Sequence, residues 1–456
     1  MTALNRAWGH MTLTGKILVP LLFLILVVGP LATILVATVI GPWLLEVLNS
    51  NQGIVRFVVA ITAILLFSIP AAFIIIYMEL KVIAFMNLRV GPDRVGPAGA
   101  AHSVVAGLKV LSKEDFSPAG ADRLVFTWAP VIVFLTSVMT FMVIPFGPGL
   151  VGQDLNIGVL YLLSVGGMSV VGLLLAGWSS FNKYSLLGGI RSAAQVVSYE
   201  IPLGLSMVGL ILLTGTMSMS KIGEAQSGFF WDWFVFRQPL GALIFFIAAT
   251  AEANRTPFDL TEADSEIVAG FATEYSGMRF GFLFFAEYVN VFIVSALMVT
   301  LFFGAWNAPV DINAILEFFK LAPIGVPALD PGAYGIGLLV AAAVVPVILT
   351  LVFAAPFYLS RSSRPAWQAL LLGFLLFNVV GIGLLGLLAY MAVPWVGGLI
   401  WFMLKSFGFV YVFVWMRGTF PRVRIDQLMG FAWKWLLPAS LLNLFVTAAA
   451  IIIVKS

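Results

Sequence analysis

Acidic residues gather in one short stretch of an otherwise apolar chain. Six carboxylates fall within 23 residues in which Arg255 is the only basic side chain: Glu252, Asp259, Glu262, Asp264, Glu266 and Glu274. Carboxyl groups buried near hydrocarbon have raised pKa values, and neighbouring like charges raise those values further, so such groups exchange protons near neutral pH. The stretch therefore predicts either a proton-exchanging path or an acidic loop that docks a basic partner, and charge alone leaves both open.

Two more acids, Glu200 and Glu287, lie at or just inside long apolar runs. An unpaired acid inside a membrane costs about 2.5–3.5 kcal/mol on insertion scales, so an acid at such a position indicates a function and a nearby partner. The alternative for both residues is a helix cap or a carboxylate at the membrane interface.

A second group of polar residues begins at Glu79 and includes Arg89. Two Gly-Pro pairs follow, beginning at Gly91 and Gly96, and predict a turn that ends the preceding helix. In the next segment, apolar and basic residues lie on opposite faces at helical spacing, which predicts an interfacial amphipathic helix that either packs peripherally or roofs a cavity open to lipid. Its apolar face comprises Ala101, Val104, Val105, Leu108 and Leu111, and its basic face His102, Lys109 and Lys113.

The elements that position these residues are apolar and long. Of the 456 residues, 61% are hydrophobic and 10% are charged, against about 25% charged in a typical soluble domain, and the mean hydropathy is +1.07. The apolar runs exceed the roughly 9–11 residues of a barrel strand and lack two-residue alternation, which predicts an all-α fold, a polytopic membrane helix bundle. About eleven transmembrane helices are expected, at 17–40, 54–78, 125–146, 155–178, 196–216, 239–253, 281–304, 336–359, 366–393, 398–416 and 435–454.

The distribution of basic residues predicts how the bundle is oriented. With the N-terminus inside, 18 of the 24 Lys and Arg residues fall in inner loops, five fall outside and Lys405 lies within a span. Because inner loops carry an excess of Lys and Arg, we expect a cytoplasmic N-terminus and an outer C-terminus. The first run is longer than the roughly 7–15 residues of a signal-peptide core, so it is interpreted as a retained helix.

Redox and metal chemistry on this chain is restricted by its composition. The chain has no cysteine and two histidines, His10 and His102. It therefore lacks the residues for Cys-bound iron–sulfur clusters, thiolate zinc sites and a bis-histidine haem. We predict no metal site and no nucleic-acid binding, and any redox centre that works with this chain is expected on a partner.

Five blocks of the sequence carry a resemblance to one family. The longest is 251–276, beginning Ala-Glu-Ala-Asn-Arg-Thr-Pro-Phe-Asp-Leu. In chain order the blocks are 89–97, 177–200, 251–276, 286–288 and 417–428. Together they resemble the H subunit of proton-translocating NADH-quinone oxidoreductase, respiratory complex I.

The resemblance implies a membrane protein whose eight core helices form much of a quinone tunnel beside the peripheral redox arm. The substrate would be a quinone, ubiquinone or menaquinone, with no covalently bound cofactor on this chain. NADH, flavin and the iron–sulfur clusters would belong to partner subunits. The expected partners are the other membrane-arm subunits, the quinone-module peripheral subunits and membrane lipids, in the inner (cytoplasmic) membrane of a bacterium.

The resemblance also assigns roles to individual residues. No catalytic residue in the strict sense is implied. The quinone tunnel would be lined by Glu79, Arg89, Gly107, Lys109 and Arg417. The proton pathway would comprise Tyr199, Glu200, Glu252, Asp259, Glu262, Asp264, Glu266, Glu274 and Glu287. Their charge partners would be Arg191 and Arg255.

Eleven expected spans exceed the family's eight core helices by three. The domain organisation expected is an extra N-terminal transmembrane helix at 1–53, a quinone-tunnel and acidic-loop core at 54–304, an insertion with two extra transmembrane helices at 305–397, and C-terminal core helices at 398–456. Two alternatives to the quinone-reducing function stay open. One is a related subunit of a ferredoxin- or F420-linked quinone or phenazine reductase or of a membrane-bound hydrogenase. The other is a proton-coupled secondary transporter.

Overall fold

The computed structural model describes residues 52–95, 99–259, 269–309 and 394–455. The chain divides into two compact units, and nearly all described residues belong to the unit formed by 60–321 and 398–456. The features below lie in that unit. Three expected spans, at 17–40, 336–359 and 366–393, lie outside the described residues.

The described part of the chain is helical and contains no strand, as the all-α prediction requires. Seven helical segments are long and apolar enough to cross a membrane: 64–86, 123–143, 158–179, 183–214, 277–302, 397–419 and 425–453. They correspond to α5 (Gln52–Met86), α7 (Arg123–Thr140), α8 (Gly158–Ser179), α9 (Lys183–Thr214), α14 (Gly277–Phe302), α18 (Pro394–Thr419) and the succession of α19 (Ile425–Phe431) and α20 (Leu437–Lys455). The eighth expected span in this part, at 239–253, is the 14-residue helix α12 (Pro239–Glu252). It is shorter than the roughly 20 residues of a full span.

Helix α9 begins 13 residues before the start expected from hydropathy. Asn182 caps it, accepting a hydrogen bond from the Tyr184 backbone N–H at 2.9 Å, and Gly215 ends it in the left-handed conformation. The added turns contain Gly, Ser and Gln, which lower hydropathy without opposing a helix that packs closely on its neighbours. A side-chain carbon on Gly189 would lie only 3.1 Å from the Gly177 Cα of α8. Such close approach of small residues is typical of helix packing in membranes.

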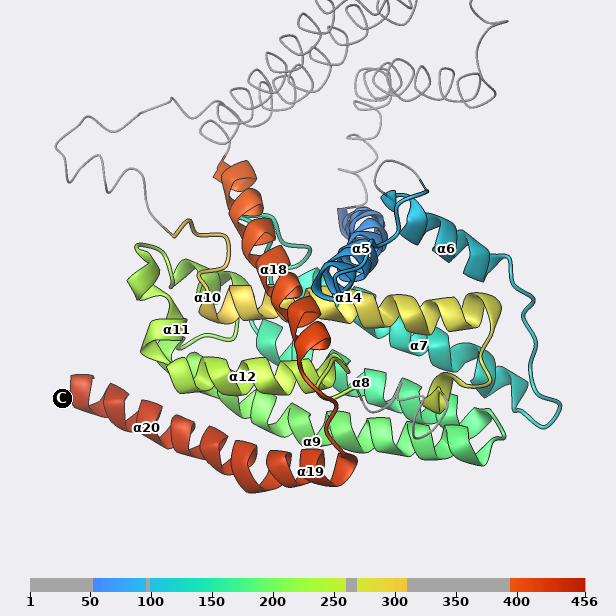
Figure 1. The fold of residues 1–456 in the computed structure, drawn as a ribbon. Helices are drawn as coiled ribbons and strands as arrows, with labels where there is room; N and C mark the ends of the chain where they lie inside the picture. The colour runs from blue at the N-terminus through green and yellow to red at the C-terminus, as the bar shows by residue number, and fades with distance from the viewer. Residues whose placement is uncertain (1–51, 96–98, 260–268, 310–393, 456) are drawn as a thin grey trace, which may run out of the picture. The chain divides into compact units, whose positions relative to one another are not determined.

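Helix α14 lies at the centre of the described bundle, with α7 along one side (Figure 1). Most of its second half is buried, including Phe292 and Phe302. Helix α18 is fixed to the end of α14 by Lys405, whose Nζ donates to the backbone carbonyls of Phe303 at 2.7 Å and Asn307 at 2.9 Å. A lysine in this position satisfies carbonyls that the helix end leaves without partners.

Helices α12 and α20 both pack on α9 (Figure 1). Between α19 and α20 the chain makes a π-helical turn at Ala432–Leu436. The Tyr199 hydroxyl of α9 donates to the Leu428 carbonyl of α19 at 3.0 Å, and the Trp433 indole N–H donates to the Ser198 hydroxyl at 3.3 Å. The end of the chain is therefore tied to the part of α9 that carries Glu200.

The expected amphipathic helix is present as α6 (His102–Leu111). Gly107 and Val110 face the bundle: a side-chain carbon on Gly107 would lie 2.8 Å from the Phe73 ring of α5, and a side-chain carbon on Gly281 of α14 would lie 3.7 Å from Val110. The apolar stripe of Val104, Val105, Leu108 and Leu111 is exposed. The helix therefore lies on the bundle through Gly107 and Val110 and presents this apolar stripe to its surroundings.

The orientation is tested by single cysteines in this cysteine-free chain. Ser112 follows α6, and Ser227 lies between α10 (Met219–Glu224) and the 3-10 turn Phe230–Asp232; both are exposed, and Ser→Cys is a small change. Ser112→Cys should react with a membrane-impermeant maleimide only in inside-out vesicles, and Ser227→Cys only in intact cells or right-side-out vesicles. Reaction of both from the same side would contradict the predicted arrangement of the helices between them.

Candidate functional site

One buried carboxylate, Glu79, brings together three helices and a loop. Its Oε1 accepts a hydrogen bond from Arg417 of α18 at 2.6 Å, and its Oε2 accepts one from Arg255 at 3.3 Å. The Tyr288 hydroxyl of α14 donates to Oε1 at 3.4 Å, and the Arg255 guanidinium lies over the Tyr288 ring, 4.4 Å from its centroid. Two of the predicted tunnel residues, Glu79 and Arg417, are thus in direct contact.

The burial of this Glu79 cluster (Glu79, Arg255, Tyr288 and Arg417) is uneven. The side chains of Glu79 and Arg255 are 10% and 6% exposed, and that of Arg417 is 28% exposed. Glu287, next to Tyr288, also acts electrostatically on this cluster, so two guanidiniums and at least two carboxylates interact here. The partly exposed Arg417 guanidinium is the group that can meet a negatively charged or negatively polarised ligand.

Arg255 reaches Glu79 because α12 ends immediately before it. Asn254 adopts a left-handed conformation, with φ of 49°, and turns the chain out of the helix. The Gln195 side-chain amide of α9 holds this turn by donating to the Asn254 Oδ1 and to the carbonyls of Ala251 and Phe258, at 2.9–3.1 Å. Gln195 is therefore a positioning residue that fixes the loop carrying Arg255.

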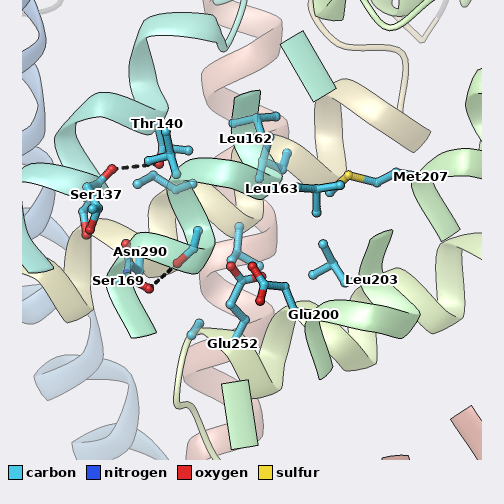
Figure 2. Close-up of a pocket in the computed structure, with 17 residues that line it drawn as sticks. Ser137, Thr140, Leu162, Leu163, Ser169, Glu200, Leu203, Met207, Glu252 and Asn290 are labelled. Carbon is cyan, nitrogen blue, oxygen red and sulfur yellow. Dashed lines mark hydrogen bonds between the residues drawn. The ribbon is translucent and has the colours of Figure 1, made fainter. Parts of the chain in front are cut away.

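A separate small cavity of about 60 Å³ lies among α7, α8, α9, α12 and α14. Glu200 of α9 and Glu252 at the end of α12 both point into it (Figure 2). A side-chain carbon on Gly166 of α8 would lie 3.3 Å from the Glu252 Oε1 and 3.5 Å from the Glu200 Oε1. The two carboxylates thus face the same point on α8, and the glycine there leaves the space between them open.

The rest of this carboxylate cavity combines polar and apolar walls. Ser137 and Thr140 of α7, Ser169 of α8 and Asn290 of α14 supply hydroxyl and amide groups (Figure 2). The volume and the polar groups suit water molecules, which need two to four polar partners. An arrangement of two carboxylates, hydroxyls and water can pass a proton from one group to the next.

The other predicted acids of the described part have partners outside this cavity. Asp259 is nearly buried and pairs with Arg422 at 3.3 Å, and Glu274 accepts a hydrogen bond from the Asn182 side chain at 2.6 Å. Near Glu274, Tyr275 stacks on Phe126 with ring centroids 4.1 Å apart, and burial raises the pKa of this tyrosine to about 12. These contacts anchor both ends of the acidic loop.

The remaining predicted residues are more scattered. Glu287 lies on α14 next to Tyr288 and one turn before Asn290, and Arg191 is on α9. Arg89 follows α5 and is exposed, as is Lys109 on α6. Glu262, Asp264 and Glu266 lie outside the described residues. Arg255 pairs with Glu79 of the predicted tunnel. Its expected pairing with acids of the proton pathway stays a prediction, because three of these acids lie outside the described residues.

Several of the residues that shape the site had no role assigned to them from the sequence. They are Tyr288, Asn182, Gly166 and the polar residues of the cavity wall. Serine, threonine and glycine are common in apolar helices, so their types gave no signal. Among the described residues, no group of three or more His, Asp or Glu is placed to hold a metal ion.

The fold and the site define a polytopic membrane protein with buried ionisable groups between its helices. A family model described as NADH dehydrogenase matches residues 57–448. The chain belongs to this family.

Several relatives are named as H subunits of NADH-quinone oxidoreductase. One from Koribacter versatilis is 42% identical over 395 residues, which cover 83% of this chain and 87% of the relative. The H subunit of Carboxydothermus hydrogenoformans is 38% identical over 388 residues, which cover 85% of this chain and 87% of the relative. The H subunit of Bacteroides thetaiotaomicron is 36% identical over 424 residues, which cover 91% of this chain and 97% of the relative. These names indicate a subunit of an oxidoreductase complex of the respiratory chain.

Arg417→Gln tests the Glu79 cluster. Removing one partner of a buried ion pair typically destabilises a protein by about 3–5 kcal/mol. In this variant Glu79 should therefore form other contacts, and the cluster loses one positive charge. In the assembled complex we expect quinone reduction to fall at least tenfold, while electron transfer from the donor to a soluble artificial acceptor stays normal.

The matched control is Arg123→Gln, at an exposed position at the start of α7. This variant should reduce quinone at the wild-type rate. Normal quinone kinetics for Arg417→Gln in a fully assembled complex would show that the cluster has no part in quinone reduction.

Proposed function

We propose that the chain is the membrane subunit of a proton-translocating NADH-quinone oxidoreductase, and that it couples quinone reduction at the Glu79 cluster to proton movement through the carboxylate cavity. The names of the relatives support the reaction. The geometry of this chain supports the assignment of its residues to the two tasks.

The observation that carries the proposal is the short segment from Glu252 to Arg255. Its first residue lines the carboxylate cavity, and its last residue pairs with Glu79. A change in the contacts of Arg255 therefore acts on a backbone turn only three residues from a cavity carboxylate. Gln195 of α9 holds this turn by hydrogen bonds, and α9 also carries Glu200. The positions of both cavity carboxylates, Glu200 and Glu252, therefore depend on α9.

The charge of the Glu79 cluster suits a quinone that gains electrons. The Arg417 guanidinium, whose side chain is 28% exposed, would stabilise negative charge that develops on the reduced headgroup. A unit charge about 6 Å away at an effective dielectric of about 20 contributes about 2.8 kcal/mol, or roughly a hundredfold change in the proton occupancy of a titrating group. An electrostatic effect of this size is sufficient to move a proton onto or off a nearby carboxylate.

The proton then has a route away from the cluster. Glu252 and Glu200 share the cavity, and Asn290 on its wall lies one turn from Glu287 on α14. In this proposal Glu287, Glu252 and Glu200 exchange protons through the hydroxyls and water of the cavity. The acidic loop with Asp259, Glu262, Asp264, Glu266 and Glu274 continues the path on the side of the quinone, where Arg89, Gly107 and Lys109 would complete the tunnel.

The other subunits of the complex would hold the NADH, the flavin and the iron–sulfur clusters. This chain would lie in a bacterial inner membrane with its acidic loop facing the cytoplasm and the peripheral subunits.

Glu→Gln substitutions at Glu200, Glu252 and Glu287 separate proton exchange from a structural role. Glutamine retains the size and hydrogen bonding of glutamate but cannot titrate. If the three residues carry protons, each variant should assemble normally yet lose at least 90% of both quinone turnover and the proton gradient in vesicles, measured per assembled complex.

Glu224→Gln, at an exposed position on α10, is the control and should behave as wild type. A purely structural role predicts that glutamine substitutes well, because its amide has the same size as the carboxyl group and still forms hydrogen bonds. Near-normal turnover and pumping in all three variants would therefore exclude the carboxylate cavity from proton transfer.

A further inference from the structure

A second and larger cavity, of about 520 Å³, lies beside the loop that carries Arg255. Pro257 and Phe258 of that loop form one wall, and α19 with the following π-helical turn forms the other. The volume is within the roughly 300–1,000 Å³ of ordinary ligand pockets. None of the roles assigned above uses this cavity.

The walls of the cavity are suited to one class of ligand. Phe258, Phe431 and Trp435 supply aromatic surface, and Lys434 supplies a single positive charge. An apolar cavity with an ammonium group at its edge fits an acyl chain joined to an anionic headgroup. A free phosphate would not require the aromatic walls, and a neutral lipid would not require the lysine.

The position of the cavity along its helix supports the same ligand. It lies beside the start of the span expected at 435–454, just before α20 begins at Leu437, and Trp433 and Trp435 are 50% and 71% exposed there. Exposed tryptophans at the end of a span are typical of the membrane interface. Lys434, which lines the cavity, lies at this end of the span, on the side expected to be cytoplasmic, and basic pockets on the cytoplasmic side of membrane proteins bind anionic lipid headgroups.

The π-helical turn at Ala432–Leu436 presents the side chains needed. Within it, Trp433 donates its indole N–H to Ser198 of α9, while the next two residues, Lys434 and Trp435, line the cavity. Turns of this kind occur frequently at functional sites. Here the turn fixes one wall of the cavity to α9 and leaves the lysine and an indole facing the other wall.

We propose that this cavity binds an anionic phospholipid of the adjacent leaflet, with the phosphate at Lys434 and the start of an acyl chain against Phe258, Phe431 and Trp435. The lipid would hold the two walls together, supplementing the backbone hydrogen bond from Val423 N–H to the Pro257 carbonyl at 3.1 Å. Since Arg255 and Glu252 precede Pro257 in the same loop, bound lipid would also stabilise the segment that couples the two sites. This effect on turnover rests on the proposed function, but the binding itself does not.

Gly430 offers a way to fill the cavity without disturbing the bundle. It lines the cavity, it lies in α19, and a side-chain carbon there would have no neighbour within 4 Å. Gly430→Leu therefore occupies the lipid position and should not weaken the helix. The matched control is Gly408→Leu, because Gly408 of α18 is also helical and its side-chain position is also open.

The experiment measures phospholipid bound to the assembled complex. The complex is purified, washed in detergent and exposed to mixed micelles of phosphatidylglycerol and phosphatidylcholine, and bound lipid is counted by mass spectrometry. Wild type and Gly408→Leu should retain one phosphatidylglycerol that Gly430→Leu lacks. Lys434→Gln should lose at least tenfold of the preference for phosphatidylglycerol, whereas Lys221→Gln, at an exposed position on α10, should keep it.

Three results would overturn the lipid site. They are equal phosphatidylglycerol retention by wild type and Gly430→Leu, equal preference in wild type and Lys434→Gln, and a polypeptide segment of the complex seated in the cavity. Adding phosphatidylglycerol back should raise the turnover of washed wild type at least twofold and leave Gly430→Leu unchanged. Equal responses of wild type and Gly430→Leu to added lipid would refute the effect of the lipid on turnover. Counting bound lipid requires no enzymatic activity, so a failure of the lipid site can be told apart from a failure of the proposed function.

Discussion

The buried carboxylate of Glu79 is the contact on which the arrangement of this protein depends. Its two oxygens are held by Arg417 at 2.6 Å and Arg255 at 3.3 Å, so α5, α18 and the loop after α12 meet at one charged group. A buried ionised group is tolerated only when it is paired and hydrogen-bonded, so these segments constrain one another. In the proposed mechanism, a ligand that changes the charge balance here acts on all three, and through the Glu252–Arg255 segment it acts on the carboxylate cavity.

Most of the described helices could be predicted because a helix that crosses a lipid bilayer must be long and apolar. Spans need long apolar windows, and seven of the eight expected in this part are membrane-length helices. The early start of α9 has a physical reason: 13 residues are added at its beginning because Gly188 and Gly189 serve close packing rather than hydropathy. The amphipathic helix α6 was predicted, and the side that lies on the bundle carries Gly107 where the Phe73 ring leaves no room for a side-chain carbon.

The sequence analysis could name candidate residues of the site, but it could not predict which of them are in contact. Acids in apolar surroundings and the family resemblance pointed to Glu79, Glu200 and Glu252. The pairing of Glu79 with Arg417 spans 338 positions of sequence, and no local pattern carries such a contact. The cavity wall depends on which side of each helix Ser137, Ser169 and Asn290 occupy, and this is set by the packing of five helices. Likewise the contact of Arg255 with Glu79 depends on the turn at Asn254 and on the hydrogen bonds from Gln195 that hold it, and no local pattern predicts these.

In the proposed mechanism, Arg255 transmits the charge state of the quinone to Glu252. The most direct measurement is redox-induced infrared difference spectroscopy of the carboxyl region in the assembled complex. Quinone reduction should produce a protonation signal that disappears in Glu252→Gln, which assigns it, and that is also lost in Arg255→Gln under conditions where this variant still binds and reduces quinone. Persistence of the Glu252 signal at full amplitude in Arg255→Gln would contradict the claim and would separate the ion-pair cluster from the carboxylate cavity.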